Sequence, residues 1–300
     1  MTDLRETSAL VALLRRGGRP WHQLAALVEE AGSAVAVLDG DNVDSSEGSA
    51  PTLFDPFDGE TSVDLDAIAA EVRAWEDDGM RVVTVLDDEY PENLRAVFNR
   101  PPLLFIRGEL VDEDCRSVAI VGARRASDVG QRRAGEIAGQ MVEAGFTVFS
   151  GLAAGIDSAG HRGALAAAGR TVAVVGTGLR RHYPAQNADL QREIAERCAV
   201  ISQFWPDQPP TKTTFPLRNI TMSGLSLATV VVEASHTSGA RLQARYALEH
   251  GRPVLLLDSL VEQHEWARAY AERPGVHVVS HPAEIVALIE RLAFAETLSV

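Results

Sequence analysis

Cysteine is scarce in this 300-residue chain, and long apolar runs are missing from it. The 2 cysteines, Cys115 and Cys198, form no CxxC pair, and no histidine cluster has metal-ligand spacing. A disulfide framework and a structural zinc site are therefore not expected. No apolar stretch approaches the ~20 residues needed to span a bilayer, and residues 1–6 lack the character of a signal peptide. We expect a cytoplasmic protein without metal, cofactor or membrane partner.

Lysine is nearly absent as well. Lys212 is the single lysine among 28 basic residues, so an anion site here must be built from arginine, whose planar guanidinium suits phosphate. The 42 acidic residues bring the formal net charge to −14, which argues against a protein that coats nucleic acid over its whole surface. The acid is concentrated at the ends, because residues 1–100 carry −13, residues 101–251 carry +2 and residues 252–300 carry −3. A local anion site in the middle of the chain is compatible with this distribution.

The length, about twice that of a typical domain, predicts two units. Residues 8–38 have helical periodicity interrupted by a Gly/Pro turn at 17–20, so we expect two short helices and then an apolar stretch at 34–38. We assign residues 1–40 to a small helical domain of the helix-hairpin type. Residues 41–62 hold six acids and no base among Ser, Gly and Pro, which predicts an acidic linker. Residues 63–300 form the second unit.

The second unit alternates short apolar runs with longer helical patterns. This alternation is typical of a parallel sheet covered by helices on both faces, so we predict an α/β fold with a Rossmann-like, doubly wound and mostly parallel sheet. A last strand and helix at 276–292 form a C-terminal extension. The expected strands are 81–86, 103–108, 118–122, 146–150, 171–176, 199–202, 230–233, 253–257 and 276–280, and the expected helices are 64–78, 129–144, 158–168, 188–197, 240–250 and 282–292.

Four loops that follow predicted strands share one composition. In an open parallel sheet, ligands bind beyond the carboxyl ends of the strands, where the strand order reverses. The loops at 122–127, 150–157, 176–181 and 235–240 each contain glycine and open a helix, so their backbone N–H groups can approach an anion. Two of them add arginine pairs, Arg124-Arg125 and Arg180-Arg181. Together these loops predict a phosphate-binding rim.

Each feature also has an ordinary structural interpretation. The glycine loops could be tight βα turns, His161 could satisfy a buried polar group, Asp157 could cap a helix, and residues 215–219 could be an ordinary loop. Glu233 could be a general base or only the end of a strand. No GxSxG surrounds a serine, and no complete GxGxxG follows a strand, so NAD binding is disfavoured. We predict a binding protein and not an enzyme.

Ten short phrases follow one another in a specific order along the chain. They are residues 88–94 (DEYPENL), 101–108 (PPLLFIRG), 118–124 (VAIVGAR), 150–157 (SGLAAGID), 176–178 (GTG), 183–184 (YP), 215–219 (FPLRN), 224–226 (GLS), 233–234 (EA) and 238–239 (SG). Their order resembles the DprA/Smf family of DNA-processing proteins, which bind single-stranded DNA and load RecA recombinase. The small helices in front also resemble that family's N-terminal domain. The resemblance implies an extended Rossmann fold, a homodimer, and a pocket that takes single-stranded DNA without sequence preference and without catalysis.

The loops and the resemblance together predict a set of DNA- or phosphate-binding residues. Carried over by motif, Arg124 would meet a phosphate, the residues near 150 would line the pocket, and those near 218 and 238 would form its far wall and floor. The set is Gly122, Arg124, Arg125, Ser150, Gly151, Gly155, His161, Arg180, Arg218, Asn219, Ser238 and Gly239.

The chain departs from the family pattern in two places. Ile220 stands where a second arginine usually follows Asn219, and Asp258-Ser259 stand where a Pro-Gly turn and a glycine-rich loop usually follow the strand at 253–257. The alternative function is a nucleotide sensor or a nucleotide hydrolase on the same fold, similar to the phosphoribohydrolases of the LOG type. Those enzymes use a loop of the pattern Pro-Gly-Gly-x-Gly-Thr-x-x-Glu, and the corresponding residues 235–244 lack its glutamate. A purely protein-binding role for the acidic N-terminal third is a further alternative.

Overall fold

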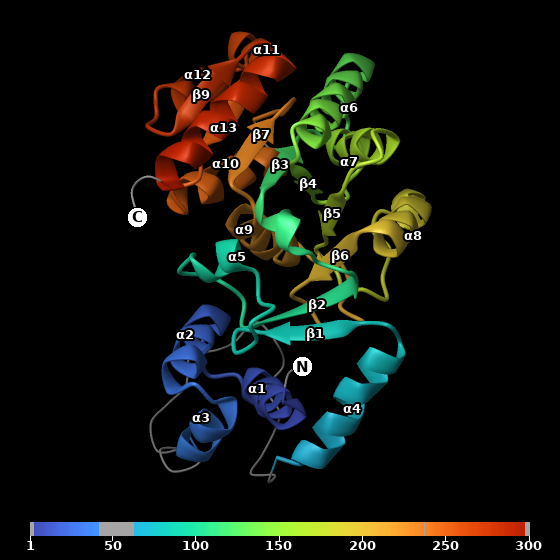
Figure 1. Ribbon diagram of the computed structural model, residues 1–300, viewed down its shortest axis with the longest axis vertical. Helices are drawn as coiled ribbons and strands as arrows, with labels where there is room; N and C mark the ends of the chain where they lie inside the picture. Colours follow the sequence, from blue (N-terminus) through green and yellow to red (C-terminus); the bar gives the residue numbers. More distant parts are fainter. Residues whose placement is uncertain (1–2, 42–62, 237, 298–300) are drawn as a thin grey trace.

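The computed structural model describes residues 3–41, 63–236 and 238–297 (Figure 1). The predicted helices at the N-terminus are present as α1 (Leu4–Arg16) and α2 (Trp21–Ala31), separated by the Gly/Pro turn. The apolar stretch that follows is itself helical, as α3 (Ala34–Asp41). Both α3 and α4 (Leu65–Asp77) pack against α1, so α4 shares the packing of the N-terminal helices. The predicted acidic linker lies outside the described residues except for its first residue.

The described residues form one sheet of nine strands in the order β1-β2-β6-β5-β4-β3-β7-β8-β9. Strands β3 to β9 pair in parallel, while β1 and β2 join through antiparallel pairing of β1 with β2 and of β2 with β6. The predicted mostly parallel Rossmann-like sheet is confirmed. The strands are β1 (Arg81–Thr84), β2 (Leu103–Gly108), β3 (Ser117–Val121), β4 (Thr147–Ser150), β5 (Thr171–Val174), β6 (Ala199–Ser202), β7 (Ala228–Val231), β8 (Val254–Leu257) and β9 (Val276–Val279).

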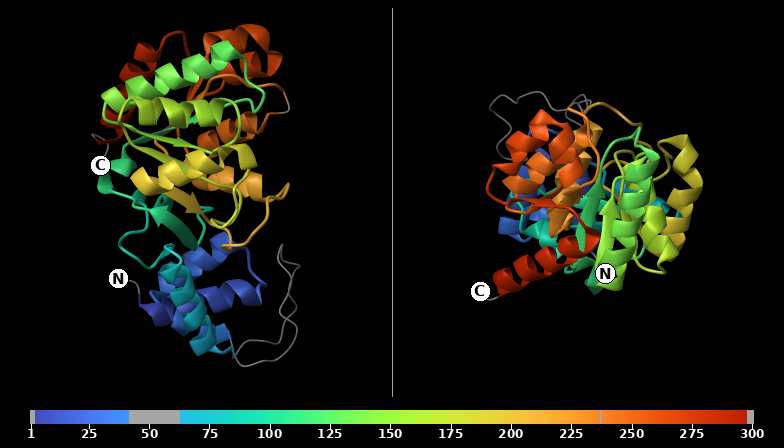
Figure 2. Two further views of the ribbon diagram at one scale, coloured as in Figure 1. Left: turned by 90° about the vertical axis from the view of Figure 1, so that its right-hand side faces the viewer. Right: turned by 90° about the horizontal axis from the view of Figure 1, so that it is seen from above.

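Helices cover both faces of the sheet. Alternate residues of β3, β4, β7 and β8 face α6 (Asp128–Glu143), α7 (Ile156–Ala166) and α13 (Pro282–Thr297), because side chains along a strand point to opposite faces. The other face packs against α9 (Thr214–Leu225), α10 (Gly239–Glu249) and α12 (Glu265–Ala271). Figure 2 shows α6 and α7 side by side on the outside of the sheet. The remaining helices are α5 (Glu92–Arg95), α8 (Ala188–Arg197), α11 (Asp258–Gln263) and the 3-10 turns at Asp112–Cys115 and Ala185–Asn187.

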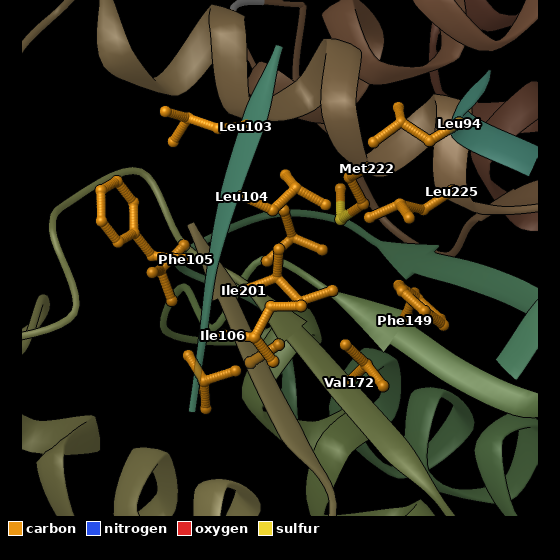
Figure 3. Packing of buried hydrophobic residues seen from close by; sticks show 14 of the residues in the cluster. Leu94, Leu103, Leu104, Phe105, Ile106, Phe149, Val172, Ile201, Met222 and Leu225 are labelled. Carbon is orange, nitrogen blue, oxygen red and sulfur yellow. The ribbon is translucent and has the colours of Figure 1, made fainter. Parts of the chain in front are cut away.

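One interpretation that the sequence left open is wrong. Residues 215–219 are not an ordinary loop, because they lie in the first two turns of α9. Pro216 is tolerated as the third residue of this helix, where the backbone N–H would have no partner within the helix. Side chains of α9 pack with β2, β4 and β5 in the apolar cluster drawn in Figure 3, which includes Met222 and Leu225.

An aromatic cluster joins the N-terminal helices to the edge of the sheet. The Trp75 ring of α4 lies 5.2 Å from Phe105 of β2 and 6.0 Å from Trp205, which follows β6. Trp21 of α2 meets Trp205 edge-on at 6.0 Å. The Arg15 guanidinium lies over the Trp205 ring at 5.3 Å, a distance suited to a cation–π contact. Elements far apart in sequence therefore share one aromatic core.

A second connection is ionic. Glu29 of α2 accepts hydrogen bonds from Arg95 of α5 at 2.7 Å and from the Arg100 Nε at 2.8 Å. Arg95 also donates to the backbone carbonyls of Val85 and Asp87. The three charged side chains are between 17% and 30% exposed. The cluster is therefore more buried than a surface ion pair and less buried than one in the protein core. It holds α2 against the loops on either side of α5.

We predict that Glu29→Gln lowers the free energy of unfolding by about 2 kcal/mol, because two partly buried arginines lose their common carboxylate. Urea unfolding followed by circular dichroism measures the change. Glu30→Gln is the matched control, since Glu30 is the exposed neighbour on the same helix and its substitution is expected to leave stability nearly unchanged. Equal stability of the two variants would contradict the prediction.

Candidate nucleic-acid interface

The strand order reverses at β3. Strands β4, β5 and β6 lie on one side of β3, and β7, β8 and β9 lie on the other. A doubly wound sheet opens a crevice at such a point, beyond the carboxyl ends of the strands. A pocket of about 660 Å³ lies here. It is lined by the loops after β3, β4 and β7, by one face of α9, and by Gln263 and His264 between α11 and α12.

Close backbone contacts lock three of these loops together. The Ala123 N–H donates to the Glu233 carbonyl at 2.6 Å, and a Cβ on Gly122 would lie 2.7 Å from that same oxygen. Gly155 adopts φ +80°, and a Cβ there would lie 2.3 Å from the Ala123 carbonyl. Side chains at these two glycines would force the loops apart. Their role is therefore to let the loops after β3, β4 and β7 meet.

Arg218 of α9 forms part of the floor of the pocket and is 6% exposed. Its Nη1 donates to the Val174 carbonyl at 2.7 Å, and its Nε donates to the Asn219 Oδ1 at 3.0 Å. The guanidinium lies directly against Gly151, where a Cβ would come within 1.7 Å of Nη1. Asn219 in turn donates to the Gly239 carbonyl at 3.3 Å, which ties α9 to the start of α10.

Asp157 lies buried beside this arginine. It is not the N-cap of α7, because Gly155 holds that position and Asp157 belongs to the first helical turn. Burial raises the pKa of Asp157 above its ordinary value of 3.8, while the charge of Arg218 and backbone N–H groups of the neighbouring loops oppose the rise. Burial also lowers the pKa of Arg218, and the positive charge of Arg124 acts in the same direction. An anion in the pocket would relieve this mutual repulsion of the two arginines.

Arg124 and Arg125 are exposed at the rim of the pocket. The Arg124 guanidinium lies 4.9 Å above the ring of Phe215. Tyr183 lies beside Phe215, with 5.6 Å between the ring centroids, and both line a smaller hollow of about 70 Å³ that Arg124 and Arg218 share with the main pocket. The sequence prediction omitted these two aromatic residues from the site. Their signal was present, because each precedes a proline within a matching phrase near a glycine loop.

The start of α10 forms another part of the pocket. Ser238 is the N-cap of this helix, and its hydroxyl accepts a hydrogen bond from the Ala240 N–H at 3.2 Å. Gly239 is exposed, and no atom lies within 4 Å of where its Cβ would be. The first N–H groups of a helix lack partners within the helix and carry partial positive charge. This end of α10 therefore suits an anion.

Five of the predicted site residues do not line the main pocket. Gly151 borders only the smaller hollow, and Gly155 makes the backbone contact between loops described above. The other three are Ser150, His161 and Arg180. Ser150 is fully buried, and its hydroxyl donates to the Ile120 carbonyl at 2.6 Å. His161 is also buried, and its Nδ1 lies 2.6 Å from the hydroxyl of Thr171, which agrees with the ordinary structural interpretation. Arg180 forms ion pairs with Asp78 at 2.9 Å and Asp207 at 2.8 Å. In these cases the side chain turns away from the rim although the residue follows or precedes a glycine loop.

Acidic groups around the pocket are engaged in structural contacts. The Glu233 carboxylate accepts hydrogen bonds from the Ser127 N–H at 3.1 Å and the Ser127 hydroxyl at 2.9 Å, which supports its structural interpretation. Within the described part of the chain, no group of three or more His, Cys, Asp or Glu side chains could hold a metal ion. Nor is any described helix long and apolar enough to cross a membrane. The lining of the described pocket includes the three arginines Arg124, Arg125 and Arg218 and the ring of Phe215.

Comparison with known proteins identifies the family of the chain. Residues 81–290 match the family model of DNA recombination-mediator protein A, which is more than half of the chain. The chain belongs to the DNA recombination-mediator protein A family. This family membership covers the whole parallel sheet and most of α13.

Relatives of the recombination-mediator protein A family resemble the chain to different extents. Protein Smf of Synechocystis sp. is 41% identical over 175 residues, which cover 57% of this chain and 44% of that protein. The first three curated relatives are matched over 44% to 61% of their own length. The crystal structure of DNA processing protein A from Streptococcus pneumoniae is 29% identical, covers 95% of this chain and 98% of its own, and superposes with a TM-score of 0.72.

A second solved structure shares the fold. It is DNA processing protein A from Helicobacter pylori, described for its single-stranded DNA binding mode, at 22% identity and a TM-score of 0.63. It covers 71% of this chain and 96% of its own.

The buried histidine behind the pocket gives a testable pH dependence. Burial, helped by the charge of Arg218, lowers the pKa of His161 from 6.5 to about 3. In the unfolded chain His161 takes up a proton near pH 6.5, whereas in the folded chain it stays neutral down to about pH 3. Its contribution to the free energy of unfolding is therefore fully present above pH 6.5 and is lost as the pH falls toward 3. We predict that the wild type loses about 2 kcal/mol more stability than His161→Asn between pH 6.5 and pH 5.

Urea unfolding at the two pH values measures this difference. His250, whose pKa burial lowers to about 4, is present in both proteins, so the comparison isolates His161. His236→Asn, at an exposed position, is the control and is expected to keep the wild-type pH dependence. An unchanged pH dependence in His161→Asn would show that the histidine is not held neutral in the fold.

Proposed function

We propose that this protein binds single-stranded DNA in the pocket at the strand-order reversal and acts as a recombination mediator without catalytic turnover. The observation that carries the proposal is the arrangement of Arg124 over Phe215 at the rim of the pocket, with Arg218 at its floor. This geometry offers both of the contacts that a single strand needs, namely cations for phosphates and aromatic faces for bases. Family membership supports the same conclusion.

Phosphate contacts would come from three directions. Arg124 and Arg125 at the rim offer forked guanidinium donors, and the start of α10 at Ser238 and Gly239 offers backbone N–H groups. Arg218 supplies a buried positive charge whose environment improves when an anion enters. All these contacts recognise the backbone that every DNA sequence shares, so they position the strand without reading its sequence.

Base contacts would come from Phe215 and Tyr183. Their rings are adjacent and border the smaller hollow beside Arg124. Tyr183 is 41% exposed, so its ring is accessible to a base. Stacking tolerates any base because each has a π face. An arginine next to two aromatic rings therefore fits an unpaired strand better than a duplex, whose bases are hidden in the stack.

The activity of the whole protein is part of the proposal. We infer that the chain forms a homodimer and delivers bound DNA to RecA in the cytoplasm, as the resemblance to the DprA/Smf family implies. A dimer would present two pockets to one strand, and the second contact would be made at a high effective concentration. A nucleotide sensor or hydrolase is not favoured, because the family is that of a recombination mediator and Glu233 is held by Ser127.

We predict that Arg124→Ala weakens binding to a fluorescein-labelled oligo-dT by about tenfold or more at low salt. The logarithmic salt dependence should also become shallower by about 0.7, because one phosphate contact releases one fewer counterion. Fluorescence anisotropy at several salt concentrations measures both quantities. Arg162→Ala removes an exposed arginine of α7 that lies outside the pocket lining, so it controls for net charge. Absence of wild-type binding at low salt would refute the proposed function.

Removal of an aromatic ring should act differently. We predict that Tyr183→Ala weakens oligo-dT binding by about fivefold to a hundredfold, which corresponds to the loss of one stacked base. The salt dependence should stay at the wild-type value, because no phosphate contact is lost. The same anisotropy titrations apply, with circular dichroism to confirm the fold. A change in salt dependence without a change in low-salt affinity would contradict the stacking role.

A further inference from the structure

The segment between β8 and β9 forms a wall of the pocket that the family pattern does not predict. Strand β8 neighbours β7, so the residues after β8 lie beside the β7–α10 loop at the same edge of the sheet. Where the resemblance implies a Pro-Gly turn and a glycine-rich loop, this chain has the two short helices α11 and α12. Gln263 and His264 at their junction line the pocket. We call residues 258–271 the α11–α12 wall.

The α11–α12 wall is held firmly by both neighbouring helices. The Arg133 Nη1 of α6 donates to the Ser259 hydroxyl at 2.8 Å. From α10, the Arg241 guanidinium lies 5.9 Å from the Trp266 ring and 5.8 Å from the Tyr270 ring. Within the wall, Arg268 Nη1 donates to the carbonyl of Glu262 at 2.9 Å. These contacts lie on both sides of the junction that carries Gln263 and His264.

The charges of the wall differ from those of the opposite side. Asp258, Glu262 and Glu265 are acidic, and the positive Arg268 is turned to the carbonyls of its own helix pair. Negative side chains near a DNA strand repel its phosphates. Glu262 and Glu265 flank Gln263 and His264 in the sequence, so we expect phosphates on the side of Arg124 and an uncharged part of the nucleotide at these two residues. Between the acids, Gln263 and His264 offer neutral hydrogen-bonding groups of the kind that contact base edges.

The width of the pocket allows this division. The strands β3, β7 and β8 are consecutive, so the loop that carries Arg124 and the α11–α12 wall begin two strand spacings apart, about 10 Å. This span has room for a backbone on one side and a base on the other. We propose that Gln263 and His264 form a base-reading subsite, which gives one position of an otherwise sequence-independent site a preference for adenine. The inference rests on the proposed single-stranded DNA binding.

Adenine is the expected base because a carboxamide pairs with it through two hydrogen bonds. The Gln263 side chain offers one donor and one acceptor side by side, which match the adenine N7 acceptor and N6 donor. The experiment measures anisotropy with labelled 12-nucleotide oligo-dA, oligo-dT and oligo-dC. The proteins are the wild type, Gln263→Ala, the double variant Gln263→Ala/His264→Ala, and the control Glu272→Gln at the exposed end of α12.

The readout is the ratio of oligo-dA affinity to oligo-dT affinity, because a general structural change would lower both. We expect the double variant to lower this ratio about fivefold relative to the wild type, with Gln263→Ala in between and Glu272→Gln unchanged. The stacking of oligo-dA on itself is common to all four proteins and cancels in the comparison. If every protein binds DNA with one and the same ratio, the base-reading subsite is overturned while the proposed function stands. If the wild type binds none of the oligonucleotides, the proposed function falls and the subsite with it.

Discussion

Burial of the Arg218 guanidinium is the constraint on which the site depends. A guanidinium taken out of water requires hydrogen-bond acceptors and negative charge in fixed places. Here the acceptors are the Val174 carbonyl and the Asn219 Oδ1, and the negative charge is the nearby Asp157 carboxylate. The guanidinium also lies so close to residue 151 that a Cβ there would clash with it, so this position requires glycine. Strand β5, helix α9 and the loop after β4 are thereby held to one geometry. The pocket forms where these elements converge.

The same constraint places positive charge at the pocket although the chain is strongly acidic. Four of the eight arginines in the first hundred residues form ion pairs, since Arg15 pairs with Glu71, Arg81 with Glu89, and both Arg95 and Arg100 with Glu29. Around the pocket, by contrast, Arg124 lies on an aromatic ring and Arg218 lies among carbonyls, with a single buried carboxylate whose pKa is raised. The net charge of −14 therefore describes the body of the protein and not its site.

Much of the fold follows from the sequence, because a buried parallel strand must be a short apolar run and a covering helix must repeat every 3.6 residues. Strand β6 and helix α8 lie where those patterns place them. The helical state of Phe215 was not visible, because Pro216 is a breaker everywhere except in a first turn. The α11–α12 wall was not visible either, since its two helices are each shorter than two full turns and show no clear period.

For the candidate site, the position of a residue could be predicted from the sequence, but the direction of its side chain could not. Glycines and arginines in loops after strands could be located from the sequence because the topology of the sheet alone brings those loops together. The direction of a side chain depends on contacts that only packing decides. Arg180 follows a glycine loop as Arg124 does, yet Asp78 and Asp207 lie within its reach, so it turns to them. Arg124 is placed instead beside Phe215, a residue nearly one hundred positions away in the chain. The part that an arginine at a strand end can play in the site thus depends on where the fold places the carboxylates around it.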